Sequence, residues 1–131
     1  MRAAPGGLVV ALLCAGAQAQ TCEGPAGAQR VESPRFIVYY SPVPGIAVNK
    51  HFGLDVTACP KPGVSGPLQL RVDARMPAHQ HGMNYKPTIS SSAPGKYKAE
   101  GLMFHMPGRW ELMFEVEAGG KTDKLAKTVD L

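Results

Sequence analysis

The sequence has little charge, few aromatic side chains and no long apolar run. Charged residues make up 18% of the 131 residues and the basic ones are scattered, which is not typical of a nucleic-acid-binding stripe or a polybasic membrane tail. The apolar run Leu8–Cys14 is far shorter than the roughly 18 to 20 residues that cross a bilayer. No stretch repeats with a helical period over a useful length, so a helical bundle is excluded.

Glycine and proline, by contrast, are abundant. The chain has 15 Gly and 12 Pro, residues that interrupt helices and mark turns. Together with the length, this composition predicts one domain built from short strands.

The first residues have the features of a secretory signal peptide. Arg2 supplies a positive charge, Leu8–Cys14 is the apolar core, and Ala17-Gln18-Ala19 is a small-x-small cleavage site. We therefore interpret 1–19 as a signal peptide, cleaved after Ala19, and expect a periplasmic or otherwise exported protein. A lipoprotein anchor at Cys14 is the alternative, but Leu13 occupies a position where the signal peptidase prefers a small side chain.

Cysteine is scarce, and its placement limits the available chemistry. Of the three cysteines, Cys14 lies in the signal peptide, leaving Cys22 and Cys59 in the mature chain. Two cysteines in an oxidising compartment are expected to form one disulfide. A thiolate metal site is the alternative, although the spacing of these cysteines does not favour it.

The mature chain divides into a leader, 20–34, and a domain, 35–131. The leader lacks periodicity up to Arg30, so we expect it to be ordered only by its cysteine. Alternating apolar and polar residues are clearest at 68–76 and 110–117. Strands are expected at 35–40, 46–58, 67–76, 86–90, 96–104, 110–117 and 122–131. About seven short strands separated by turns predict an all-β fold, an antiparallel β-sandwich of immunoglobulin-like or cupredoxin-like type.

Histidine and methionine gather in two short segments. Residues 76–83 (MPAHQHGM) and 103–107 (MFHMP) contain three of the four histidines and four of the six methionines. Each segment follows an expected strand and so lies at a strand end or loop. Imidazole is a borderline donor and thioether a soft one, a combination that suits copper, as Cu(I) or Cu(II).

Four of these residues are the predicted metal ligands. His79 and His81 are separated by one residue, so in extended backbone both side chains point to the same face. Met83 lies two residues further on, and His105 points away from the core if Phe104 packs inward. Ordinary exposed histidines are the alternative interpretation of His79 and His81.

The remaining candidates are reserve ligands or structural residues. Met76 continues the apolar face of its strand and Met103 lies in an apolar run, so we expect both to be core residues. Met76, Met103 and Met106 are reserve metal ligands. His51, beside a phenylalanine at a strand start, is interpreted as structural.

The sequence does not indicate an enzyme. No carboxylate lies within the HxHGM segment to act as a base, no serine or cysteine has a nucleophile context, and no phosphate-binding loop occurs. The expected mature N-terminus is Gln20, which excludes a copper oxygenase that uses an N-terminal histidine. A blue-copper site needs a cysteine thiolate, and both mature cysteines are expected to be paired.

The segments MPAHQHGMNYKP and GKYKAEGLMFHMPGRWELMFEVE resemble the YtkA-like family of exported β-sandwich proteins and, more loosely, periplasmic copper-binding proteins of the copper-resistance type. The likeness covers Leu68 to Val116. Its structural signature is carried by Gly95, Tyr97, Met106, Pro107, Gly108, Trp110, Leu112, Phe114 and Val116. The resemblance implies a metal-binding or assembly-accessory module, and it favours His79, His81, Met83 and His105 as the site.

We therefore consider two alternative functions, which belong to different functional classes. The first is a periplasmic copper-binding protein that carries or buffers copper, or delivers it to a partner metalloenzyme. The second is a metal-free module that docks an envelope protein through the His-Met loops or a sheet edge.

Overall fold

The computed structural model describes residues 2–4, 6, 10–12 and 21–131. Most of the predicted signal peptide, including its cleavage site at 17–19, lies outside the described residues. Within the described part, no helix has the length and apolar character needed to cross a membrane.

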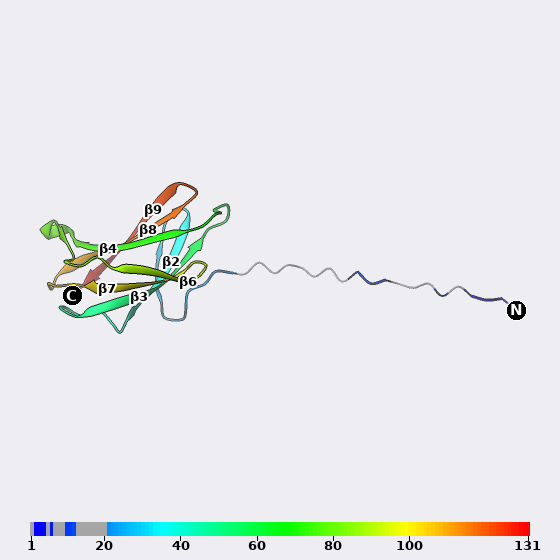
Figure 1. Ribbon diagram of the computed structural model, residues 1–131, viewed down its shortest axis with the longest axis horizontal. Helices are drawn as coiled ribbons and strands as arrows, with labels where there is room; N and C mark the ends of the chain where they lie inside the picture. Colours follow the sequence, from blue (N-terminus) through cyan, green and yellow to red (C-terminus); the bar gives the residue numbers. More distant parts are fainter. Residues whose placement is uncertain (1, 5, 7–9, 13–20) are drawn as a thin grey trace.

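The protein is an all-β sandwich of two antiparallel sheets (Figure 1). The five-stranded sheet has the order β1-β2-β3-β7-β6. Its strands are β1 (Gln29–Glu32), β2 (Phe36–Val43), β3 (His51–Pro60), β6 (Thr88–Ala93) and β7 (Lys96–Met103). The four-stranded sheet has the order β5-β4-β8-β9. Its strands are β4 (Gln69–Met76), β5 (His81–Gly82), β8 (Arg109–Ala118) and β9 (Lys121–Asp130). A single 3-10 turn, η1 (Pro77–His79), joins β4 to β5.

The core forms because alternate residues of the long strands point into the space between the sheets. In β4 and β8 every second side chain is buried, which confirms the predicted alternation. The largest fully buried side chains are Trp110, Phe36, Phe104, Phe114, Leu54, Met76, Leu102 and Leu112. Burying a large apolar side chain contributes about 1.5–3 kcal/mol.

All seven predicted strands are present, with ends that differ by a few residues, and two further strands were not predicted. The expectation that the leader is irregular up to Arg30 was wrong, because Gln29–Glu32 forms β1 by pairing with β2. The other unpredicted strand, β5, has two residues and exists only through its pairing with the end of β4. Both are edge strands too short to give a periodic pattern.

The predicted disulfide is confirmed. Cys22 and Cys59 are bonded, with Cα atoms 5.6 Å apart, and join the segment before β1 to the end of β3. Gly119-Gly120, a pair of residues typical of a two-residue hairpin turn, joins β8 to β9, and both glycines have the positive φ, 61° and 76°, that this tight turn requires.

One polar cluster connects the two sheets. The Ser33 hydroxyl donates to Asp123 Oδ2 at 2.7 Å, and Arg35 Nε donates to Asp123 Oδ1 at 2.8 Å. Ser33 and Arg35 lie at the β1–β2 turn, whereas Asp123 belongs to β9 of the other sheet. The hydrogen bond from Ser33, together with those from Arg35, holds the pKa of Asp123 below the ordinary carboxyl value. The ionised carboxylate thus ties the sheets together.

Candidate metal site

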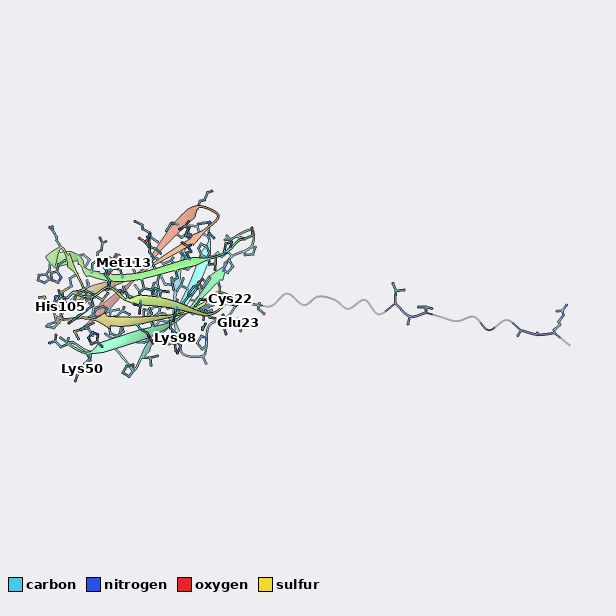
Figure 2. The ribbon with its side chains drawn as sticks, viewed as in Figure 1. Cys22, Glu23, Lys50, Lys98, His105 and Met113 are labelled. Atoms are coloured by element: carbon cyan, nitrogen blue, oxygen red, sulfur yellow. A yellow bond between two sulfur atoms is a disulfide. The ribbon has the colours of Figure 1, made fainter. Side chains whose placement is uncertain are left out.

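The two His-Met segments meet at one end of the sandwich. The first continues from β4 through η1 and β5, and the second joins β7 to β8, so they come from opposite sheets. Figure 2 shows His105 and Lys50 at this end, and Cys22 and Glu23 at the other. The site is therefore remote from the disulfide.

The chain reverses tightly after β4. Pro77 begins η1, and Gln80 adopts a left-handed conformation with φ 53° and its N–H donating to the Pro77 carbonyl at 3.3 Å. The extended backbone that we expected at His79 and His81 is thus wrong, because the 3-10 turn and the left-handed residue intervene. Their rings are nevertheless neighbours, with centroids 5.8 Å apart.

Three imidazoles form a continuous row. His81 lies in the middle, 5.8 Å from His79 and 5.2 Å from His105 between ring centroids. His79 is exposed on η1, whereas His81 and His105 are half-buried. We refer to His79, His81 and His105 as the histidine row. The structure thus brings together the three histidines that the sequence proposed as ligands.

Trp110 forms the inner wall of this site. Its indole lies edge-to-face with His105 at 5.4 Å and with His81 at 6.0 Å between centroids, and it stacks on Phe104 at 4.7 Å. Its Nε1–H donates to the Met106 carbonyl at 2.9 Å, which fixes the loop that carries His105. Trp110 occupies an apolar position of the alternating segment 110–117, and only the tertiary structure shows that it also supports two candidate ligands.

The ring nitrogens of the two half-buried histidines are in different states. His81 Nδ1 lies 3.1 Å from the Gly82 carbonyl oxygen. A carbonyl only accepts hydrogen bonds, so this contact is a hydrogen bond in the tautomer with the proton on Nδ1, which leaves Nε2 as the nitrogen that can bind a metal. His105 Nδ1 is buried and has no hydrogen-bond partner in the described structure. Such an unpaired buried atom costs about 1–3 kcal/mol.

The methionines differ in their access to the row. Met83 and Met106 are partly buried against the core, next to the candidate histidines in sequence. Met76 is only 1% exposed, as its alternation predicted. Met103 was also expected in the core but is half-buried, because Leu102 and Phe104 take the inward positions on either side of it.

The row is not a preformed cage. Within residues 21–131, and in the described residues before them, no group of three or more His, Cys, Asp or Glu side chains is already arranged around a common metal position. Rotation of the imidazoles about their side-chain bonds is needed to direct three nitrogens to one point. The donor types in the row and in the methionines next to it in sequence are imidazole nitrogen and thioether sulfur, a set that fits copper better than hard cations.

Comparisons with known proteins add no relative: no family model matches the chain, and no curated protein or solved structure matches it either. The resemblance to the YtkA-like family therefore depends on the motif residues alone.

Proposed function

We propose that this protein is an exported copper-binding protein that carries or buffers copper, or delivers it to a partner metalloenzyme. Its ligands are His79, His81 and His105, with Met83 as the thioether. The single observation that carries the proposal is the buried, unpartnered Nδ1 of His105, on a ring 5.2 Å from that of His81. A metal ion bound to an unprotonated Nδ1 would satisfy this nitrogen, which has no hydrogen-bond partner among the described residues.

The exposure of the row favours a carrier over a structural metal site. His79 is exposed, so one ligand is accessible to solvent and to an incoming partner. Structural metal sites are instead closed by their full ligand set. A row that needs side-chain rotation to close around an ion can also open to release it.

Copper titration of the mature protein, with its disulfide intact, tests the proposal. Cu(I) is titrated anaerobically in competition with a chromophoric chelator, and Cu(II) in air. We expect tight binding that weakens at least tenfold in the double variant His79→Ala/His81→Ala. Absence of copper binding, or unchanged affinity in the double variant, contradicts the proposal.

A suitable control removes a methionine outside the two His-Met segments. Met113 lies on β8 with Asp73 and Ala126 as its ladder neighbours, and Figure 2 shows it on the opposite sheet from Lys98. Met113→Leu should leave copper binding unchanged.

A metal-free docking module is the second candidate, and the edge of β4 favours it. Arg75 and Met76 of β4 pair with β5, and the Ala74 carbonyl accepts a hydrogen bond from the Met83 N–H, so within the described structure 69–73 have no strand on that side. An unpaired edge is a template for an added strand. A partner complex that survives both a chelator and His79→Ala/His81→Ala would support this function against copper delivery.

A further inference from the structure

The fourth histidine faces a methionine on the outer side of the five-stranded sheet. His51 begins β3, Met103 ends β7, and the two are directly opposed in the antiparallel ladder. Opposed residues project from the same face, with Cβ atoms about 4.5–5.5 Å apart. Their neighbours Phe52 and Leu102, also opposed, are buried on the other face. An imidazole and a thioether therefore share the outer surface. We call them the His51–Met103 pair.

This surface is accessible and hollowed. His51 is exposed and Met103 half-buried. A pocket of about 320 Å³ adjoins His51 and is lined also by Gly53 and Gly101, which contribute no side chains. A Cβ at Gly53 would lie 3.0 Å from the Ala99 carbonyl oxygen, so the floor of the pocket is backbone. The pairing of β3 with β7 shifts register between Phe52 and Leu54, two of the residues that line the pocket.

The His51 ring has a defined neighbour. It lies edge-to-face with Tyr85, with centroids 5.1 Å apart. Tyr85 belongs to the segment that follows Met83, so the loop that carries the first thioether also contacts His51. The pair thus lies at the same end of the sandwich as the histidine row.

We infer that His51 and Met103 form a second metal site, specific for Cu(I). One nitrogen and one thioether sulfur are soft enough for Cu(I), and the pocket that His51 lines, although Met103 does not, leaves space for further ligands beside the imidazole. Two carboxylates also line the pocket, those of Asp55 and Glu100. Asp55 Oδ1 lies 3.9 Å from Lys98 Nζ and forms an ion pair with it, and Glu100 is exposed to solvent. The space beside the imidazole allows a donor from a partner to enter, as exchange of the ion requires. The inference does not depend on the histidine row binding copper.

Binding stoichiometry tests this site. The disulfide-bonded protein is titrated with Cu(I) under argon in competition with bicinchoninate. If the histidine row binds one equivalent, we expect two for the unaltered protein and one for His51→Ala and for Met103→Leu; if the row binds none, we expect one, none and none. Met113→Leu, the same substitution at a methionine with no histidine opposite it, should match the unaltered protein. An unchanged number of equivalents in both His51→Ala and Met103→Leu would overturn the inference, as would binding of Zn(II) but not Cu(I) at this position.

A spectroscopic measurement decides the question even if a variant fails to fold. Ag(I), a diamagnetic substitute for Cu(I), is added to ¹⁵N-labelled His79→Ala/His81→Ala protein. We expect the ring nitrogen resonances of His51 to shift, and unchanged His51 resonances would overturn the inference. If instead His79→Ala/His81→Ala keeps the stoichiometry of the unaltered protein while His51→Ala loses one equivalent, the proposed function fails and this inference stands.

Discussion

The imidazole of His105 stands edge-on to the indole of Trp110, with ring centroids 5.4 Å apart and planes at 77°. Trp110 is fully buried, and the same indole approaches His81. One core residue therefore joins the hydrophobic interior to the candidate metal site, so events at the histidines should be detectable through the tryptophan.

Copper should quench tryptophan fluorescence. Trp110 is the only tryptophan of the chain, so the emission reports on this position alone. We expect saturable quenching on addition of Cu(II) to the unaltered protein, because the ion would bind beside the indole. His79→Ala/His81→Ala should show little quenching at the same concentration, whereas Met113→Leu should behave as the unaltered protein. Equal quenching in all three proteins would place the ion elsewhere.

Replacing His105 by leucine should separate stability from binding. An apolar side chain removes the buried nitrogen that has no partner, so we expect the free energy of unfolding to stay unchanged or rise by up to about 2 kcal/mol. Copper affinity should fall at least tenfold. Urea unfolding of the metal-free protein and chelator competition measure the two effects. A loss of stability above about 1 kcal/mol would show that the imidazole supports the fold by itself.

Two methionines should respond differently to the same substitution. Met83→Leu should weaken Cu(I) binding about tenfold, because it removes the thioether that the proposal assigns to the site, two residues after His81 in the sequence. Met76→Leu should leave the affinity unchanged and cost less than about 1.5 kcal/mol of stability, because Met76 is a core residue and the swap conserves volume. Chelator competition on both variants checks this, and a larger loss of affinity in Met76→Leu would reverse the assignment.

Asp123→Asn should destabilise the fold at neutral pH and make little difference in acid. At pH 7 we expect a loss of about 1–3 kcal/mol, since the carboxylate accepts charge-assisted hydrogen bonds from Ser33 and Arg35. The pKa of Asp123 is lowered in the folded protein, so its stabilisation is complete above the ordinary Asp pKa of about 3.9. It is lost as the pH falls through the lower, folded-state value.

Urea unfolding at pH 7 and in acid measures this difference. Asp130→Asn is the matched control, because the Arg109–Asp130 pair is exposed and screened by solvent and should contribute little at either pH. A difference between Asp123→Asn and the unaltered protein that is the same at both pH values would exclude the ionised carboxylate as its source.

Much of the fold was predictable because the pattern that indicates a strand lies in consecutive residues of the sequence. Apolar and polar residues alternate in β4 and β8, and this alternation predicts which side chains face the core. Gly119-Gly120 likewise indicates a hairpin turn without information from distant residues. The edge strands β1 and β5 were not predictable in this way. They are short and exposed, and each becomes a strand only because a longer neighbour offers hydrogen-bonding groups.

The candidate site was predictable in composition but not in geometry. Its residues were indicated by their clustering in two segments, yet the argument for His79 and His81 assumed an extended backbone that η1 and Gln80 replace. His51 was interpreted as an isolated structural residue. Nothing near it in the sequence indicates that Met103 lies opposite, since pairing of β3 with β7 joins segments about fifty residues apart.

The sequence by itself determined the buried faces of the long strands, the disulfide and the types of atom that could bind a metal. The alternation of apolar residues, the number of cysteines and the softness of imidazole and thioether donors can all be read without knowing the fold. Only the tertiary structure decided which donors meet. The two sheets place the end of β4 beside the end of β7, which brings His81 to 5.2 Å from His105 and encloses His105 Nδ1 without a partner. Contacts between sheets follow from strand order and register, and these are set by the packing of the whole core.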